Sequence, residues 1–221
     1  STRVRSSAAS DVYKRQTITL PKVTASVNSM NLLGKVIILD SGHGGVDAGA
    51  TGNQIIEKDL NLILTRKLEK ELVSRGATVY LTREDDKDLS TTTVNRKRSD
   101  LYNRAKYINK ISPNMYISIH LNSVTNSSWR GLQVFYTTKN EENKLIAETI
   151  TNHLKESISN VREIKKDNTY YMYKHITSPG VLIEAGFISN PNDSYLLRNK
   201  EYQDKLISSI SDSIEIYFQK K

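Results

Sequence analysis

The stretch KVIILDSGHGGVDAGATGNQIIEKDL, residues 35–60, decides the fold. It begins with a short continuous apolar run, KVIILD, which is typical of a β-strand that is covered on both faces. A glycine-rich loop follows and holds His43, one of four histidines in the 221-residue chain. Gly42, Gly44 and Gly45 predict a backbone with positive φ and a loop that keeps bulk away from the imidazole. Such a loop leaves one side of His43 open to a ligand.

Strands and helices alternate along the chain on both sides of this loop. After the strand at 35–40, apolar spacing and chain breakers predict helices at 58–75, 95–111, 141–158 and 201–218, and strands at 77–83, 115–120, 131–137 and 181–186. The first helix places Leu60, Ile63, Leu64, Leu68 and Leu72 at helical spacing. Strands that alternate with helices favour a sheet between helical layers. We therefore expect an α/β fold, a single three-layer αβα domain with a mixed, largely parallel sheet.

Three ionisable residues follow or close predicted strands. His43 follows the first strand, His120 closes the strand at 115–120, and Glu184 lies in the strand at 181–186. In open α/β sheets the functional crevice lies off the carboxyl ends of the strands. We expect these three side chains to converge at one edge of the sheet.

Composition excludes several kinds of site. The chain has no cysteine, so any metal must be held by His, Asp or Glu. It has no apolar run of 18 residues, which a membrane-spanning helix requires. The net charge of +8 would suit nucleic acid, but residues 1–33 supply +4 of it, from five basic residues against Asp11. No motif interleaves aromatic and basic residues, so we expect no nucleic-acid partner.

The N-terminal residues have a different character from the rest of the chain. SSAASDVYKRQ, residues 6–16, looks like the translation of a sequencing adapter, so we interpret residues 1–16 as an artefact. Residues 17–33 are rich in Ser and Thr and predict a linker, and residues 34–221 form the predicted catalytic domain. On this interpretation the true N-terminus is lost, together with any export signal or membrane anchor.

A metal site is the simplest use of these histidines. Zinc in hydrolytic sites is commonly held by two histidines and one carboxylate, and the fourth position is left to water. His43, His120 and Glu57 make such a set. Glu57 stands before the predicted first helix, where a carboxylate also suits the helix dipole, so a purely structural role remains an alternative.

Four segments carry a family resemblance. DSGHGG, IEKDLNL, SIHLNS and VLIEAGFISNP, in this order and spacing, resemble the signature segments of the zinc-dependent N-acetylmuramoyl-L-alanine amidases, and the similarity runs from Lys35 to Tyr217. WRGLQVFY and SPGVLIEAGFISNPND most resemble the sporulation-type, germination-specific branch. The resemblance implies cleavage of peptidoglycan between glycan and stem peptide, outside the cytoplasm at the cell wall or spore cortex.

The resemblance also assigns residue roles. It implies Zn²⁺ on His43, Glu57 and His120, with Glu184 as the catalytic carboxylate. The apolar neighbours of Glu184 favour a raised carboxyl pKa, which suits proton transfer; without the resemblance, a salt-bridged strand end would be the simpler interpretation. The family usually has proline at the position of Ser41, and serine predicts a looser turn before His43.

Other residues and functions remain open at the level of sequence. We expect Asn122 to bind substrate or to cap its loop, and Arg83 and Asp85 to form a loop ion pair. His153 is predicted on the surface, whereas His175 could lie near the crevice mouth. The alternatives to the amidase are another zinc amidohydrolase or peptidase, a catalytically idle wall-binding pseudoenzyme, and a basic nucleic-acid binder. Because this looks like a bare catalytic domain, an accessory or activating protein is a possible partner.

Overall fold

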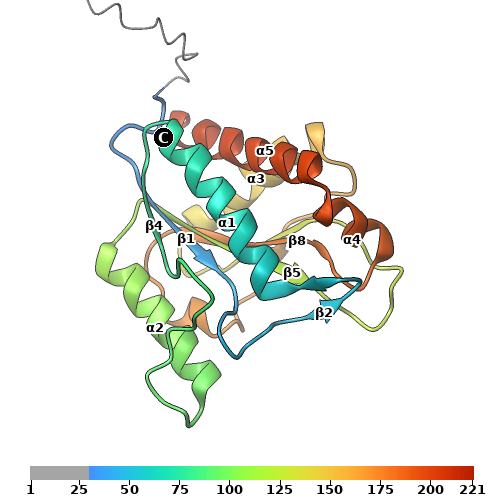
Figure 1. Cartoon of the computed structure of the whole chain (residues 1–221). Coiled ribbons are helices and arrows are strands. Elements are labelled where there is room, and N and C mark those ends of the chain that lie inside the picture. Colours follow the sequence, from blue (N-terminus) through green and yellow to red (C-terminus); the bar gives the residue numbers. More distant parts are fainter. Residues whose placement is uncertain (1–29) are drawn as a thin grey trace, which may run out of the picture.

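A computed structural model describes residues 30–221 of the chain. The predicted artefact at 1–16 and most of the predicted linker lie outside these residues. The described part forms a six-stranded sheet in the order β4-β1-β5-β8-β6-β7 (Figure 1). The strands are β1 (Val36–Ser41), β4 (Thr78–Leu81), β5 (Met115–Asn122), β6 (Gln133–Tyr136), β7 (Lys165–Lys166) and β8 (Gly180–Phe187).

The sheet is mixed and largely parallel, as predicted. β1 pairs in parallel with β4 and β5, and β5 pairs in parallel with β8. Only β6 is antiparallel to its neighbour β8. The central strands β1, β5 and β8 are buried along almost their whole length, which explains why their sequences read as continuous apolar runs. Because they are parallel, their carboxyl ends meet at one edge.

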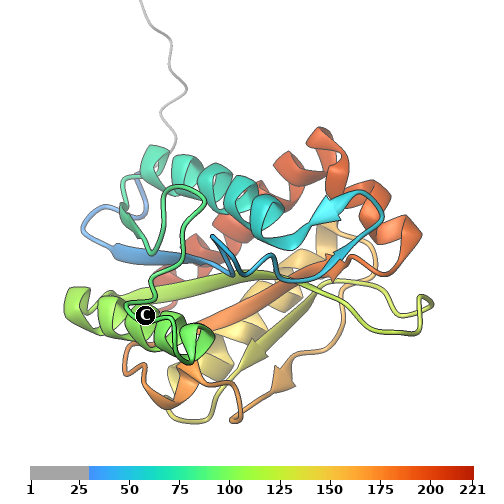
Figure 2. The ribbon, with the colours of Figure 1, turned by 60° about the horizontal axis from the view of Figure 1, so that its bottom comes forward.

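Helices cover both faces of this sheet. Helices α1 (Glu57–Ser74), α3 (Glu142–Ser157) and α5 (Lys200–Gln219) pack together over one face. Helix α2 (Arg96–Ile111) and the short 3₁₀ helix η1 (Met172–Lys174) lie side by side on the other face, as Figures 1 and 2 show. This is the expected three-layer arrangement.

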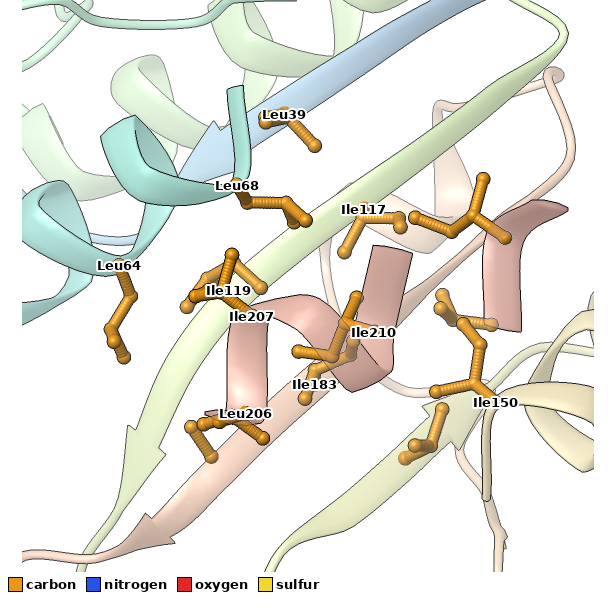
Figure 3. Packing of buried hydrophobic residues seen from close by; sticks show 14 of the residues in the cluster. Leu39, Leu64, Leu68, Ile117, Ile119, Ile150, Ile183, Leu206, Ile207 and Ile210 are labelled. Atoms are coloured by element: carbon orange, nitrogen blue, oxygen red, sulfur yellow. The ribbon is translucent and has the colours of Figure 1, made fainter. Parts of the chain in front are cut away.

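The larger core lies between the sheet and helices α1, α3 and α5 (Figure 3). Leu64 and Leu68 of α1 and Ile210 of α5 meet Ile117 of β5 and Ile183 of β8, and all five side chains are almost completely buried. Burying each such side chain contributes about 1.5–3 kcal/mol. A smaller cluster, which includes Ile38, Ile108, Tyr116 and Tyr173, fills the space under α2 and η1. The two clusters fix the sheet between its helical layers.

The described chain starts against this core. Leu32, in the last part of the range predicted as a linker, is completely buried, and its N–H donates to the carbonyl oxygen of Arg75. Across residues 30–221, no helix combines the length and the apolar character that a membrane crossing requires.

Some elements escaped sequence analysis. These are a hairpin of β2 (Thr51–Gly52) and β3 (Ile55–Ile56), the edge strand β7, η1 and helix α4 (Pro191–Arg198). Helix α4 has a signal that could have been read, because Asn190 caps it by accepting from the N–H groups of Asn192 and Asp193, and Pro191 opens it.

Candidate active site at the carboxyl edge of the sheet

His43, Glu57 and His120 meet at the carboxyl edge of the sheet. His43 lies in the loop after β1, Glu57 is the first residue of α1, and His120 lies near the end of β5. Glu57 Oε1 is 3.1 Å from Nε2 of His43 and 3.1 Å from Nδ1 of His120. One ligand atom from each residue lies within 4.8 Å of the other two. The sequence therefore named three residues that the fold brings together.

The loop after β1 holds His43 in an uncommon backbone conformation. Its φ is +62°, a region that non-glycine residues adopt rarely and that is typical of functional positions. Nδ1 of His43 lies 2.9 Å from the Asp47 carboxylate. Burial opposes protonation of His43, but Glu57 and Asp47 outweigh it and raise the pKa of His43. A carboxylate on the second ring nitrogen orients the imidazole, so that Nε2 faces Glu57.

Glu57 is held as a carboxylate. Burial opposes its ionisation, but hydrogen bonds from His120 and His43 outweigh burial and hold the pKa of Glu57 well below its usual range. The N–H of Ala50 also donates to its Oε2 over 2.7 Å, and the N–H of Leu121 donates to Oε1 over 3.1 Å. Its place at the start of α1 adds the favourable field of a helix N-terminus. The side chain is thus both ionised and fixed in direction.

These three residues fit a zinc ion by their chemistry and spacing. Two imidazole nitrogens and one carboxylate oxygen form a donor set that zinc commonly takes. Tetrahedral zinc at ordinary bond lengths holds its ligand atoms about 3.4 Å apart, close to the 3.1 Å between Glu57 and each histidine. In the protein alone, a ring nitrogen of each histidine faces the Glu57 carboxylate. A divalent cation held by the three residues would supply positive charge next to that carboxylate.

Glycines leave room for these side chains. A Cβ on Gly42 would lie 2.2 Å from Cε1 of His120, and a Cβ on Gly49 would lie 2.5 Å from Oε2 of Glu57. Gly44 and Gly45 have positive φ, as predicted, whereas the prediction of positive φ is wrong for Gly42. The α-carbons of Gly44 and Gly45 face the segment around residues 87 and 88 instead of an imidazole. The prediction that glycine keeps bulk away from an imidazole therefore holds for Gly42. It holds also for Gly49, which sequence analysis did not name.

Two buried arginines hold the carbonyl groups of the His43 loop. Arg83 donates to the carbonyl oxygens of Ser41 and Gly42 over 3.0 and 3.1 Å. Arg104 donates to the carbonyl oxygens of Ser41 and His43, each over 2.6 Å. The hydrogen bonds from the two arginines hold the turn at Ser41 in place. They support this turn although serine stands where the family usually has proline.

The predicted ion pair between Arg83 and Asp85 is wrong. Arg83 is only 1% exposed, and it reaches the backbone carbonyl of Asp85 and not the carboxylate. The Asp85 carboxylate lies 3.4 Å from Lys87 instead. Arg83 follows β4, whose end lies beside the end of β1, so the carbonyl groups of the His43 loop lie within its reach.

A buried carboxylate in β1 supports the second arginine. Asp40 is completely buried and lies 2.9 Å from Arg104, and it also accepts from the hydroxyl groups of Ser118 and Thr82. Burial opposes ionisation of Asp40, but Arg104 and the two hydroxyl groups outweigh it and lower the pKa of Asp40. Arg104 also contacts Asp100 on its own helix at 2.9 Å. The network ties α2 to the centre of the sheet.

Glu184 lies beside the three-residue cluster, on the strand next to His120. It pairs with His120 across β8 and β5, and both side chains line one cavity of about 210 Å³. Burial raises the pKa of Glu184 to about 7, with a smaller opposing effect of His120. Its Oε2 is buried without a hydrogen-bond partner within residues 30–221. The alternative of a salt-bridged strand end is wrong for the described chain, because no cation there forms an ion pair with Glu184.

Other residues singled out from sequence lie around or away from this cavity. Asn122 ends β5 beyond a break in the strand register after His120, and it is not among the side chains that line the cavity. His175 contacts the rings of Tyr102 and Tyr171 in a neighbouring groove. His153 is partly exposed on α3, 3.2 Å from Glu156.

Sequence analysis missed four residues of the site. These are Asp47, Asp40, Arg104 and Tyr170, the last of which lines the cavity with its ring centroid 6.3 Å from that of His120. Asp47 had a signal, because a carboxylate four residues after a loop histidine is well placed to orient it. Arg104 and Tyr170 had none, because only the packing of α2 and of the segment before η1 brings them to the sheet edge.

Comparison with known proteins agrees with this geometry. A family model described as N-acetylmuramoyl-L-alanine amidase matches residues 37–216. The germination-specific N-acetylmuramoyl-L-alanine amidase of Bacillus subtilis, strain 168, is 42% identical over 198 residues, which cover 87% of this chain and 84% of that protein.

Two solved structures extend the comparison. The CwlD amidase from Clostridioides difficile, solved in complex with the GerS lipoprotein, has 38% identity and a TM-score of 0.80, and the match covers 85% of this chain and 100% of that one. An N-acetylmuramoyl-L-alanine amidase from Clostridium difficile 630 has 28% identity and a TM-score of 0.76, with 88% and 99% covered.

Proposed function

The chain belongs to the N-acetylmuramoyl-L-alanine amidase family, and we propose that it hydrolyses the amide bond between N-acetylmuramic acid and L-alanine in peptidoglycan. The observation that carries this proposal is the convergence of His43, Glu57 and His120 beside Glu184 at one cavity. Three potential ligands next to a carboxyl group with a pKa of about 7 are what a metal-assisted amide hydrolase requires.

We propose that His43, Glu57 and His120 hold Zn²⁺. When bound, zinc lowers the pKa of water towards about 7 and polarises a carbonyl group. The residues around the cluster prepare it for a cation. Asp47 orients His43, and the N–H groups of Ala50 and Leu121 fix the Glu57 carboxylate. The distance from Glu57 to each histidine is therefore already close to the spacing that zinc requires.

Glu184 is the proposed catalytic residue. As a carboxylate it takes a proton from the attacking water, whose oxygen forms a bond with the lactyl carbonyl carbon. The protonated Glu184 then gives this proton to the alanine nitrogen as the C–N bond breaks, so a lactyl carboxylate and a free amine result. A pKa near 7 suits both steps, because a group that must accept and release a proton works best when its pKa is near the working pH.

Asn122 is proposed as a substrate contact. It stands two residues after His120 at the end of β5, and its partial exposure leaves it accessible from the sheet edge. An amide side chain offers both a donor and an acceptor to the acetamido and peptide groups of the substrate. Asn122 lies outside the lining of the cavity, so we expect it to affect substrate affinity more than turnover.

The biological setting of this activity is also a proposal. The similarity to a germination-specific amidase supports a role in spore cortex formation or germination, on the outer side of the cytoplasmic membrane. The solved complex of the CwlD amidase with the GerS lipoprotein supports the idea that an accessory protein binds this chain as well.

Mass spectrometry of digested peptidoglycan tests the proposal. The zinc-loaded protein should release stem peptides that begin with L-alanine, and a chelator should stop their release. His120→Ala should lower the zinc content of the purified protein, which is measured by elemental analysis, whereas His153→Ala on the distant face of α3 should not. Release of disaccharides or of shortened peptides instead would contradict the amidase assignment, and full activity with chelator would contradict the metal.

A further inference from the structure

We propose that a basic groove next to the catalytic cavity binds carboxylate groups of the stem peptide. This inference rests on the proposed function, because it names the part of the substrate that lies on the α2 side of the site. The groove has a volume of about 800 Å³ and runs between the first turns of α2 and the segment around η1. Arg98, Tyr171, Lys174 and His175 line it.

The groove adjoins the catalytic cavity. Lys97 and Leu101, both in the first half of α2, line the groove and the cavity alike. A substrate whose scissile bond lies beside Glu184 can therefore extend into the groove without leaving the protein surface. The two helices that bound the groove lie side by side in Figures 1 and 2.

The groove carries positive charge that the described residues do not neutralise. No Asp or Glu lines it. Within residues 30–221, no carboxylate lies within 4.0 Å of the cationic groups of Arg98 or Lys174. The other two basic residues of the groove do have carboxylate partners: Arg96 lies 2.7 Å from Asp88, and Lys97 lies 3.8 Å from Asp47. Arg98 and Lys174 are thus the groove cations that remain available to an anionic ligand.

Aromatic rings hold Arg98 in place. Its Nε donates to the hydroxyl group of Tyr171 over 3.2 Å, and its guanidinium carbon lies 5.0 Å from the centre of the Tyr171 ring. The His175 ring lies against Tyr171 in turn, with ring centres 4.7 Å apart. A guanidinium fixed in this way loses less freedom on binding a carboxylate, and its terminal nitrogens match a carboxylate in a bidentate manner.

The substrate offers anionic groups on one side of the scissile bond only. The N-acetylated sugars are neutral, and the lactyl group of the substrate is in its amide form. The stem peptide carries free carboxylates, on its glutamate residue and at its C-terminus. Opposite charge therefore directs the peptide, and not the glycan, towards Arg98 and Lys174. A phosphate-rich wall polymer has the same charge but no covalent link to the scissile bond.

Kinetics with two matched substrates test this assignment. One is N-acetylmuramoyl-pentapeptide with free carboxylates, and the other has the same peptide with these carboxylates converted to carboxamides. The double variant Arg98→Ala, Lys174→Ala should raise KM for the first substrate about fivefold or more, with kcat nearly unchanged, since each exposed ion pair contributes modestly. On the carboxamide substrate its KM should equal that of the wild type.

Lys70→Ala provides the matched control. Lys70 is an exposed lysine of α1, on the opposite face of the sheet, and no carboxylate lies within 4.0 Å of it in the described chain. It should leave both KM values unchanged. An unchanged KM in the double variant, or an equal rise with both substrates, would overturn the proposal.

A binding measurement separates this proposal from the proposed function. The free pentapeptide, titrated calorimetrically into the wild type, should bind more weakly as salt is raised and much more weakly to the double variant. If the wild type binds peptide in this way but hydrolyses no substrate, the groove stands and the amidase function falls. If the double variant loses affinity for polyglycerol phosphate but keeps it for the pentapeptide, the groove is a phosphate-polymer site and the proposal is wrong.

Discussion

Glu184 lies within the apolar strand β8, and its Oε2 is buried and finds no hydrogen-bond partner in the described chain. Burial alone accounts for most of the rise of its pKa to about 7. A cation held by His43, Glu57 and His120 would add positive charge beside it and favour its ionised form. The proton affinity of this one side chain therefore depends on the apolar strand around it and on the charge held at the cluster of His43, Glu57 and His120.

We expect Glu184→Gln to lose activity without losing the metal. Glutamine has the same shape, and no ion pair is broken, so the free energy of unfolding should change by less than about 1.5 kcal/mol. Because an amide cannot exchange the proton, peptide release should fall by about 10²- to 10⁴-fold. Elemental analysis should find the zinc content of the wild type in the variant. Activity close to that of the wild type would show that another group transfers the proton.

Gly49, in the glycine-rich loop after β1, and Gly34, in the turn before β1, differ in their surroundings, and this distinction belongs to the scale of the element. Gly49 and Gly34 both have positive φ, at +67° and +77°. A Cβ on Gly49 would lie 2.5 Å from Oε2 of Glu57 and 2.7 Å from Cδ2 of His43, whereas a Cβ on Gly34 meets nothing within 4 Å. The two positions thus share a backbone conformation that would strain an alanine, but they differ in what surrounds them.

We expect Gly49→Ala to weaken metal binding and Gly34→Ala to leave it intact. Each alanine should cost about 1 kcal/mol of stability through its left-handed backbone. Only the first should also displace Glu57 and His43, and we expect its zinc dissociation constant to rise at least about tenfold. Competition with a chromogenic chelator measures the affinity, and urea unfolding measures the strain. Equal zinc affinities in the two variants would mean that the loop moves aside without disturbing the ligands.

The sequence predicted the long elements better than the short ones. The apolar runs of β1, β5 and β8 and the helical spacing of α1 were sufficient to predict these elements. Ile63, which was counted in the apolar face of α1, is nevertheless 48% exposed. At 3.6 residues per turn, Leu60, Leu64, Leu68 and Leu72 drift around one side of α1 and leave Ile63 about 120° from their centre. The β2–β3 hairpin was missed because its two-residue turn places Asn53 and Gln54 at positive φ, without the glycine that usually signals such a turn.

The candidate site also contains residues that could be predicted from the sequence and residues that could not. His43, His120 and Glu184 could be placed from sequence because they follow parallel strands or lie in their carboxyl halves, and the carboxyl ends of such strands must meet. Arg83 and Arg104 could not be assigned, because their acceptors lie in the His43 loop, about 40 and 60 residues away along the chain. Such long-range contacts depend on how α2 and β4 pack on β1, and no local pattern encodes that packing.

At the scale of the whole molecule, Asp40 and Arg104 join the central strand to α2. Asp40 has a pKa below the ordinary value of 3.8 because Arg104, Ser118 and Thr82 stabilise its carboxylate more than burial opposes it. A lowered carboxyl pKa contributes stability that is complete above the ordinary value and is lost as the pH falls through the folded-state value. The protein should therefore lose this contribution in acid, and not at neutral pH.

We expect Asp40→Asn to reveal this contribution. At neutral pH the variant should be less stable than the wild type by about 3 kcal/mol, because a buried ion pair loses one partner. The difference should shrink as the pH falls from 3.8 to the lower folded-state pKa of Asp40, because the unfolded wild type takes up a proton first and the folded wild type loses its charge at the lower value. Urea unfolding with a chelator present, repeated over this range of pH, measures the stability difference at neutral pH and its decrease in acid. The control Asp204→Asn, at an exposed position, should differ little from the wild type in stability at every pH. A stability difference for Asp40→Asn that stays constant with pH would contradict the proposed contribution of the Asp40 charge.

The order of strands in the sheet has a consequence for how the protein is made. β8 lies between β5 and β6, both of which the ribosome synthesises earlier. A nascent chain that ends before residue 180 has no strand to place between them, so the edges of β5 and β6 lack their common neighbour and remain open to wrong pairing. It also lacks Glu184. The proposed hydrolytic activity therefore requires synthesis through β8, and a nascent chain that ends before Glu184 cannot carry it out.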